Sequence, residues 1–145
     1  MVALLDVNVL IALIDPYHIH HEAADNWFAH NRQQGWATCA VTENGLVRVV
    51  CNPSYQGTRV TLKDGVASLR RLCEMRGHVF WSELLSIRDS RIFRWNHVQG
   101  YRQLTDLYLL ALAAINGGKL ASFDDAISIR AITDATAINL EIIPS

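Results

Sequence analysis

Short apolar segments alternate with longer helix-like segments along the whole chain, and this alternation limits the possible folds more than any other feature. The apolar runs predict strands at residues 2–5, 35–39, 78–81, 119–122 and 139–143. Strands that alternate with helices favour a parallel sheet covered by helices on both faces. The sequence therefore predicts an α/β fold in three layers, with a central parallel sheet of four to five strands.

Capping residues and prolines place the ends of the predicted helices. Thr42, Thr61 and Thr105 are expected to cap three helices at their N termini. Pro16 and Pro53 end two helices, because proline lacks the backbone N–H that a helix needs. The predicted helices cover residues 7–14, 21–31, 42–50, 61–76 and 106–116.

The length and composition fit one domain. Residues 82–101 show no clear pattern, but no linker or repeat interrupts the chain, so we expect residues 1–145 to form a single unit. Such a chain buries roughly two thirds of its unfolded surface. Three cysteines without a Cys-x-x-Cys pair argue against a disulfide framework and favour the cytoplasm. The longest apolar run, 107–115, is shorter than the roughly 20 residues of a membrane span.

Four acids lie next to predicted strands or helix starts. Asp6 and Asp124 follow strands, whereas Glu43 and Asp106 open helices. In a parallel sheet, strand ends and the helix starts that follow them share one edge, so all four acids can meet there. Two carboxylates 4 Å apart repel by roughly 4 kcal/mol at an effective dielectric of about 20. A divalent cation removes this repulsion, and carboxylate oxygens suit Mg²⁺ or Mn²⁺ better than zinc.

Charge is unevenly distributed, although the net charge is only −1. Residues 59–102 hold nine basic and four acidic side chains, a balance of +5. Eleven of the 13 basic residues in the chain are arginine, which binds phosphate through two parallel hydrogen bonds. The middle of the chain is thus a candidate polyanion-binding surface, although residues such as Arg70 fit the solvated face of a helix equally well.

The segments around the four acids resemble a PIN domain, and more closely a VapC-type toxin of a bacterial toxin–antitoxin pair. The matching segments are Leu5 to Ile11 (LDVNVLI), Thr42-Glu43, Gln103 to Ala113 (QLTDLYLLALA) and Leu120 to Asp124 (LASFD). Their order and spacing agree with the family from end to end. The resemblance implies a metal-dependent endoribonuclease that is inhibited by a cognate antitoxin and is often a homodimer.

The resemblance also implies roles for individual residues. Asp6, Asp106 and Asp124 match the metal-binding acids of the family, and Glu43 matches its remaining catalytic acid. We expect Mg²⁺, or alternatively Mn²⁺, to activate a water molecule that attacks the RNA phosphodiester.

Three further residues are candidates for supporting roles. Asn8 and Thr105 are expected to orient the acids, although Asn8 fits equally well as the residue that satisfies the turn after the first strand. Arg102 lies four residues before Asp106 and is the first candidate for RNA binding. Trp95, between two polar residues, is a candidate for stacking on an unpaired base.

Two other functions stay open at this level. A haloacid-dehalogenase-like phosphatase also places an acid such as Asp6 after a strand, but its second acid would fall at Asn8. A non-catalytic RNA-binding PIN module would retain the fold and use the acids structurally. The cluster of His18, His20 and His21 fits a solvated loop better than a metal site. The sequence does not name the RNA target.

Overall fold

Five parallel strands form a sheet at the centre of the computed structural model, which describes residues 1–55 and 59–145. Their order across the sheet is β3-β2-β1-β4-β5, and every neighbouring pair is parallel. The fold class predicted from the alternating pattern is confirmed. The strands are β1 (Ala3–Leu5), β2 (Trp36–Cys39), β3 (His78–Trp81), β4 (Lys119–Ser122) and β5 (Leu140–Ile142).

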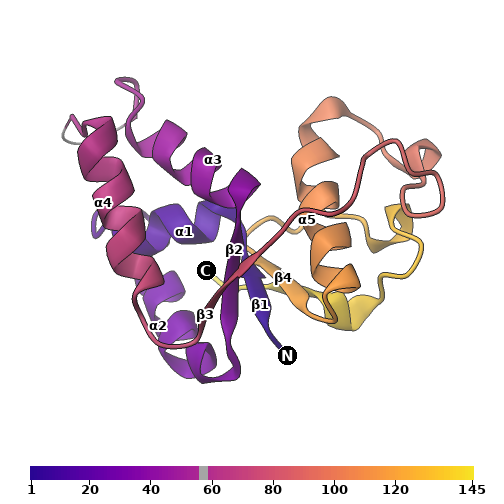
Figure 1. The fold of residues 1–145 in the computed structure, drawn as a ribbon, viewed down its shortest axis with the longest axis horizontal. Helices are drawn as coiled ribbons and strands as arrows, with labels where there is room; N and C mark the ends of the chain where they lie inside the picture. Colours follow the sequence, from indigo (N-terminus) through magenta and orange to yellow (C-terminus); the bar gives the residue numbers. More distant parts are fainter. Residues whose placement is uncertain (56–58) are drawn as a thin grey trace.

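Helices cover both faces of the sheet, as Figure 1 shows. Four helices lie on one side, and α5 lies on the other side together with the irregular segment that follows β3. The first four helices are α1 (Val7–Ile14), α2 (His21–Asn31), α3 (Ala40–Val50) and α4 (Leu62–Cys73), and α5 covers Leu104–Ile115. The three predicted layers are therefore present.

Successive strand residues face opposite helical layers and build two apolar clusters. Leu5 and Trp36 pack with Phe28 and other residues on the side of the first four helices. Leu4 and Ala37 pack on the side of α5, against its run of buried leucines and alanines. The inner strands β1, β2 and β4 are thus buried on both faces, which explains why they read as continuous apolar runs rather than alternating ones.

Two helices begin earlier than predicted. Thr61 does cap α4, since its hydroxyl accepts a hydrogen bond from a backbone N–H of the first turn at 3.1 Å. Thr42 as the cap of α3 is wrong: Cys39 holds that position, and Thr42 reaches back from the third helical residue to accept from the Cys39 N–H at 3.0 Å. Thr105 as the cap of α5 is also wrong, because the helix begins at Leu104.

The segment between β3 and α5 is irregular but anchored. It contains two 3₁₀ turns, Trp95–His97 and Tyr101–Gln103. Phe93 forms an isolated antiparallel bridge with Ile132 and is buried in the cluster under α5. The Trp95 ring stacks on the Phe93 ring with centroids 4.9 Å apart.

The sheet separates the basic residues of the middle segment into two groups. Arg70 and Arg71 lie in the last turn of α4, on one side of the sheet. Arg88, Arg94 and Arg102 lie in the segment that follows β3, on the side of α5. The expected basic surface is therefore not one continuous patch, because the chain crosses the sheet edge within it. Nothing among the described helices is long and apolar enough to cross a membrane.

Candidate metal centre and active site

Asp6 joins the central strand to the first helix. Its backbone is extended, with φ −62° and ψ 156°, and its Oδ1 accepts a hydrogen bond from the Val7 N–H at 2.7 Å, which caps α1. The residue is only 4% exposed, and this burial raises the pKa of its carboxyl group, with a hydrogen bond from Ser122 acting in the opposite direction. A buried carboxylate in this position requires a proton or a cation nearby.

Ser122 connects three parts of the site. Its hydroxyl donates to Asp6 Oδ2 at 2.6 Å and accepts from Asn8 Nδ2 at 3.2 Å and from the Asp124 backbone N–H at 3.0 Å. Asn8 Oδ1 accepts in turn from the Phe123 N–H at 3.3 Å. Asn8 therefore acts on Asp6 through Ser122 rather than directly, and it also satisfies the backbone after β4.

Asp106 and Asp124 complete a group of three carboxyl groups. Asp124 follows β4 and its Oδ1 accepts from the Ala126 N–H at 2.9 Å, while Asp106 is the third residue of α5. The pKa of Asp106 is raised to about 7, mainly by burial. The negative charge of Asp6 is the next cause, and the charge of Asp124 and a hydrogen bond between Asp106 and Asp124 add to it. Without a cation, Asp106 is thus half protonated near neutral pH.

The three aspartates form an all-oxygen set of ligands. They come from the ends of two adjacent strands, β1 and β4, and from the start of α5. The charges of Asp6 and Asp124 contribute to the raised pKa of Asp106, and a hard divalent cation would neutralise this negative charge. The residues present therefore fit the metal ion that the sequence predicts at this edge.

Glu43 lies in a different group of side chains. Because α3 begins at Ala40, Glu43 is its fourth residue, and helical side chains lean back toward the N terminus. Its Oε1 accepts a hydrogen bond from Thr38 Oγ1 at 2.8 Å, and its other close neighbours are Cys73 and His78. No hydrogen bond among residues 1–55 and 59–145 joins Glu43 to the three aspartates. Asp106 lies within electrostatic reach of Asp6 and Asp124, and the place of Glu43 beside them stays a prediction.

The remaining predicted site residues are at the surface. Thr105 is exposed, and within the described residues its side chain makes no hydrogen bond to the aspartates, so its supporting role stays a prediction. Arg102 is exposed, with Nε 3.4 Å from the Tyr101 hydroxyl and its guanidinium 5.8 Å from the Tyr101 ring centroid. The two ion pairs of the described residues, Arg91–Asp89 and Lys119–Glu141, do not involve it.

Ser122 is the residue that sequence reasoning missed. It is fully buried and ends an apolar strand, and a serine in such a place must find hydrogen-bond partners. Ser122 lies two residues before Asp124, and alternate residues of a strand point to the same face. This spacing is the signal from which a place for Ser122 beside the acids could be predicted.

Comparisons with known proteins agree with this geometry. A sequence model of the family described as "PIN domain" matches residues 3–132. Ribonuclease VapC44 of Mycobacterium tuberculosis is 41% identical over 140 residues, which cover 97% of this chain and 98% of that protein. Ribonuclease VapC39 of the same organism is 41% identical over 128 residues, 88% of this chain and 92% of that protein.

Solved structures share the fold at low sequence identity. VapBC2 from Rickettsia felis, bound to a DNA fragment from its promoter, superposes with a TM-score of 0.64 at 12% identity, covering 99% of this chain and 100% of that one. VapC20 of Mycobacterium tuberculosis, described as a sarcin-ricin loop cleaving toxin, gives 0.62 at 11% identity, covering 92% and 98%. By fold, by its aspartate group and by sequence identity over nearly its whole length, this chain belongs to the PIN-domain family, among the VapC-type ribonucleases.

Proposed function

We propose that this chain is the toxin of a toxin–antitoxin pair, an Mg²⁺-dependent endoribonuclease that hydrolyses RNA phosphodiester bonds with a metal-activated water. The observation that carries this proposal is the group formed by Asp6, Asp106 and Asp124 at the edge of the sheet, in which the charges of Asp6 and Asp124 help to raise the pKa of Asp106. The sequence identity to VapC ribonucleases supports the same activity.

Each aspartate has a separate role in this proposal. Asp6 is held in place by hydrogen bonds from Val7 and Ser122, and its remaining lone pairs make it the first metal ligand. Asp106 becomes the second ligand when it loses the proton that it shares with Asp124. Asp124 is the third ligand, direct or through water. When bound, Mg²⁺ supplies a lower pKa for water and neutralises charge on the phosphate oxygens; Mn²⁺ suits the same ligands.

Glu43 is predicted to hold a second ion or to position the attacking water. Its carboxylate accepts from Thr38 in this structure, so that role requires the side chain to turn away from Thr38 toward the aspartates. Nothing in the Asp6, Asp106 and Asp124 group depends on this movement.

A groove beside α5 is a candidate for the RNA bases. It has a volume of about 310 Å³ and is lined by residues of the segment before α5, including Trp95, Tyr101 and Leu104. Trp95 is 37% exposed and Tyr101 is 83% exposed, so both rings are accessible to a stacking base. Leu104 begins the helix that carries Asp106 two residues later, and this closeness in the chain supports the assignment.

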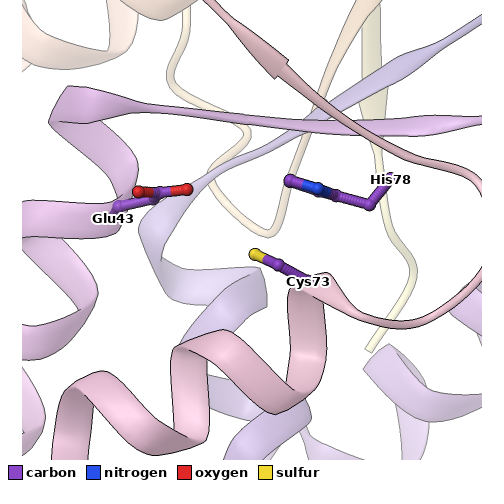
Figure 2. A group of neighbouring side chains, drawn as sticks. All are labelled: Glu43, Cys73 and His78. Carbon is purple, nitrogen blue, oxygen red and sulfur yellow. The ribbon is translucent and has the colours of Figure 1, made fainter.

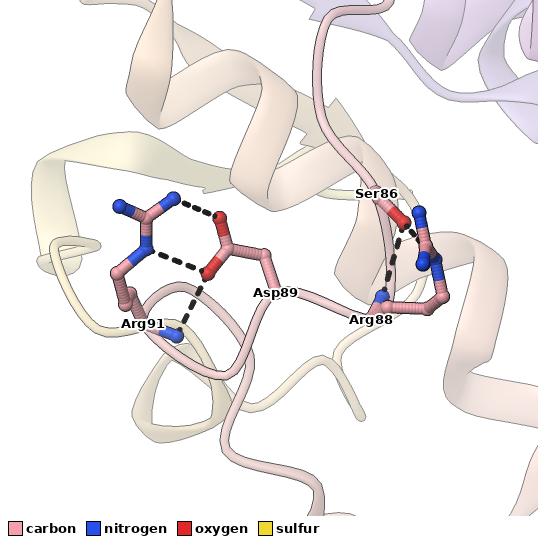
Figure 3. A network of polar contacts seen from close by, with 4 residues as sticks. All are labelled: Ser86, Arg88, Asp89 and Arg91. Atoms are coloured by element: carbon pink, nitrogen blue, oxygen red, sulfur yellow. Dashed lines mark hydrogen bonds and ion pairs between the residues drawn. The ribbon is translucent and has the colours of Figure 1, made fainter.

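The arginines of the same segment differ in their availability to phosphate. Figure 3 shows that Arg91 donates hydrogen bonds from Nε and Nη2 to the Asp89 carboxylate, at 3.0 and 2.8 Å. This pairing lowers the pKa of Asp89 to about 2. The Arg88 Nε donates to Ser86 at 3.2 Å. Arg102 has no acidic partner among the described residues, and we therefore assign it the first role in RNA binding.

The expected partners follow from the same family likeness. We expect a cognate antitoxin that places a basic side chain, such as arginine, against the three aspartates and so excludes RNA. We also expect a homodimer and a cytoplasmic location, where RNA is present and the three cysteines stay reduced. Size determination with and without the co-expressed antitoxin tests both assemblies.

Cleavage of a structured RNA under Mg²⁺ and Mn²⁺ titration tests the activity. We expect metal-dependent cleavage by the wild type, loss of cleavage in Asp106→Asn, and near wild-type cleavage in Asp125→Asn, which removes an exposed neighbouring acid. Absence of cleavage by folded wild type at every metal concentration would favour the non-catalytic RNA-binding module. A covalent aspartyl-phosphate on Asp6 would favour the phosphatase.

A further inference from the structure

Glu43, Cys73 and His78 converge on one point between α3, α4 and β3, as Figure 2 shows. Glu43 comes from the first turn of α3, Cys73 is the last residue of α4, and His78 is the first residue of β3. A ligand atom from each of the three lies within 4.8 Å of the other two, and all three residues are half-buried. This group is separate from the three aspartates of the proposed ribonuclease site.

Local structure holds these side chains in place. The chain turns sharply between Cys73 and His78, and Gly77 takes the left-handed conformation that this turn requires, with φ +94°. The His78 ring packs against the Trp36 ring with centroids 4.7 Å apart. The helices that carry Glu43 and Cys73 pack against each other. The convergence therefore depends on three fixed elements rather than on a loop.

A buried hydroxyl links two of the three side chains. Thr38 is fully buried in β2, and its Oγ1 donates to Glu43 Oε1 at 2.8 Å and lies 2.7 Å from His78 Nε2. Because the Thr38 hydroxyl donates its hydrogen to Glu43, the His78 ring N–H donates to Thr38 Oγ1 in the second contact. The order His78, Thr38, Glu43 fixes the orientation of both outer side chains, as supporting residues do in metal sites.

The donor set distinguishes this group from the aspartate site. It offers one sulfur, one imidazole nitrogen and one carboxylate oxygen, a mixture that suits Zn²⁺ and Co²⁺ rather than Mg²⁺. We propose that Glu43, Cys73 and His78 form a second metal site, which binds Zn²⁺ with three protein ligands and a fourth, open position.

The geometry requires only a small adjustment. Zinc bonds to these atoms are about 2.0 to 2.3 Å long, so ligand atoms around a tetrahedral ion lie roughly 3.3 to 3.7 Å apart. Side-chain rotations that move each ligand atom by on the order of 1 Å bring the three atoms from their separation of up to 4.8 Å to that distance. Binding converts the Cys73 thiol to a thiolate, and its proton passes to the solvent.

Zinc at this site has a consequence that rests on the proposed function. An ion bound by Glu43 holds this acid beside Cys73 and His78, where it is not free to position water or a second ion, and Zn²⁺ would then slow Mg²⁺-dependent cleavage. Zinc that inhibits by entering the aspartate site would do so equally in Cys73→Ser. Inhibition that disappears in Cys73→Ser assigns the effect to the second site.

Cobalt titration of the whole protein tests the site without any ribonuclease activity. We expect one Co²⁺ per chain to give the near-ultraviolet band of a thiolate–cobalt bond and the visible bands of tetrahedral cobalt; Co²⁺ held by the aspartates gives no thiolate band. The thiolate band should be lost in Cys73→Ser, and affinity should fall by roughly 10- to 100-fold in His78→Gln. Zn²⁺ should displace the cobalt and raise the melting temperature of the wild type.

Matched variants make the result specific. Cys51→Ser alters another half-buried thiol, His18→Gln alters the separate histidine cluster, and Asp106→Asn alters the aspartate site; all three should keep the thiolate–cobalt band of the wild type. Each variant is compared in its metal-free fold by circular dichroism. The proposal is overturned if no thiolate band forms, if the band persists in Cys73→Ser, or if it is lost in Cys51→Ser. Loss of RNA cleavage alone would bear on the proposed function and not on this site.

Discussion

The Ser122 hydroxyl donates to Asp6 Oδ2 at 2.6 Å, and so the last residue of β4 fixes the orientation of the acid that follows β1. The two strands are neighbours in the sheet, with Leu5 paired with Ala121. The contact therefore depends on strand register, since a slip of one residue would turn Ser122 to the other face. Four predictions follow from this site and its surroundings.

Replacing Ser122 by alanine should weaken metal binding by roughly 10- to 100-fold, because Asp6 loses the group that orients it. The variant also leaves Asn8 Nδ2 and the Asp124 N–H without their partner, at a cost of about 1–3 kcal/mol in unfolding free energy. Calorimetric Mn²⁺ binding and urea unfolding measure the two effects. Ser54→Ala, at an exposed serine, is the control. Unchanged Mn²⁺ affinity in Ser122→Ala would show that Asp6 does not need this support.

Asp106→Asn should flatten the dependence of stability on pH in EDTA. The pKa of Asp106 is about 7 in the folded protein and 3.8 in the unfolded reference, so between these values the folded state binds more protons. The wild type therefore loses stability as the pH rises from about 4 to 7, and the asparagine variant loses less.

Above pH 7 the Asp106→Asn variant should be the more stable protein. A fully dry site would give about 4 kcal/mol for this shift, and the partial exposure of Asp106 reduces the expectation to about 1–2 kcal/mol. Urea unfolding at pH 5 and pH 8 gives the comparison. Equal pH slopes for the two proteins would contradict a raised pKa at Asp106.

Asp6→Asn should abolish cleavage while the fold remains. Asparagine caps a helix about as well as aspartate, so α1 keeps its first hydrogen bond from Val7. What is lost is the negative charge that a cation requires. Cleavage rates at saturating Mg²⁺, beside circular dichroism spectra, test this, with Asp125→Asn as the matched change of charge. Wild-type turnover in folded Asp6→Asn would remove this residue from the site.

Arg102→Gln should weaken RNA binding and reduce its dependence on salt. Each phosphate contact to a single strand contributes a slope of roughly −0.7 in log affinity against log salt, so the loss of one contact should flatten the slope by about that amount. Arg70→Gln removes the same charge from α4, on the other face of the sheet, and should have little effect. An unchanged slope together with a lowered melting temperature in Arg102→Gln would indicate a structural role instead.

The sheet and most of the helices could be predicted from the sequence because they depend on local patterns. Each predicted strand lies within one residue of the observed one at both ends, since a strand buried on both faces reads as an apolar run. The starts of α3 and α5 were harder. Threonine is a good cap, yet Thr42 lies inside its helix and bonds back to Cys39. The sequence does not show at which of several nearby residues the preceding strand ends. It therefore does not show which residue caps the helix.

The aspartate group could also be predicted, because strand ends and helix starts meet at one edge in any parallel sheet. The position of Glu43 could not. It depends on the start of α3 and on Thr38, whose hydroxyl competes for the carboxylate. The proximity of Glu43 to Cys73 and His78 was equally hidden, since it arises from the packing of α4 on α3 and not from any spacing in the sequence.

The pairing of β1 with β4 also governs when the proposed site comes into existence during synthesis. Asp6 leaves the ribosome before β4 and Asp124, which follow more than 100 residues later. Contacts between such distant parts of a chain form late in folding. A nascent or prematurely terminated chain that ends before β4 lacks both Ser122 and Asp124. A cell that makes this protein is thus exposed to its complete aspartate group only after β4 and Asp124 have been synthesised.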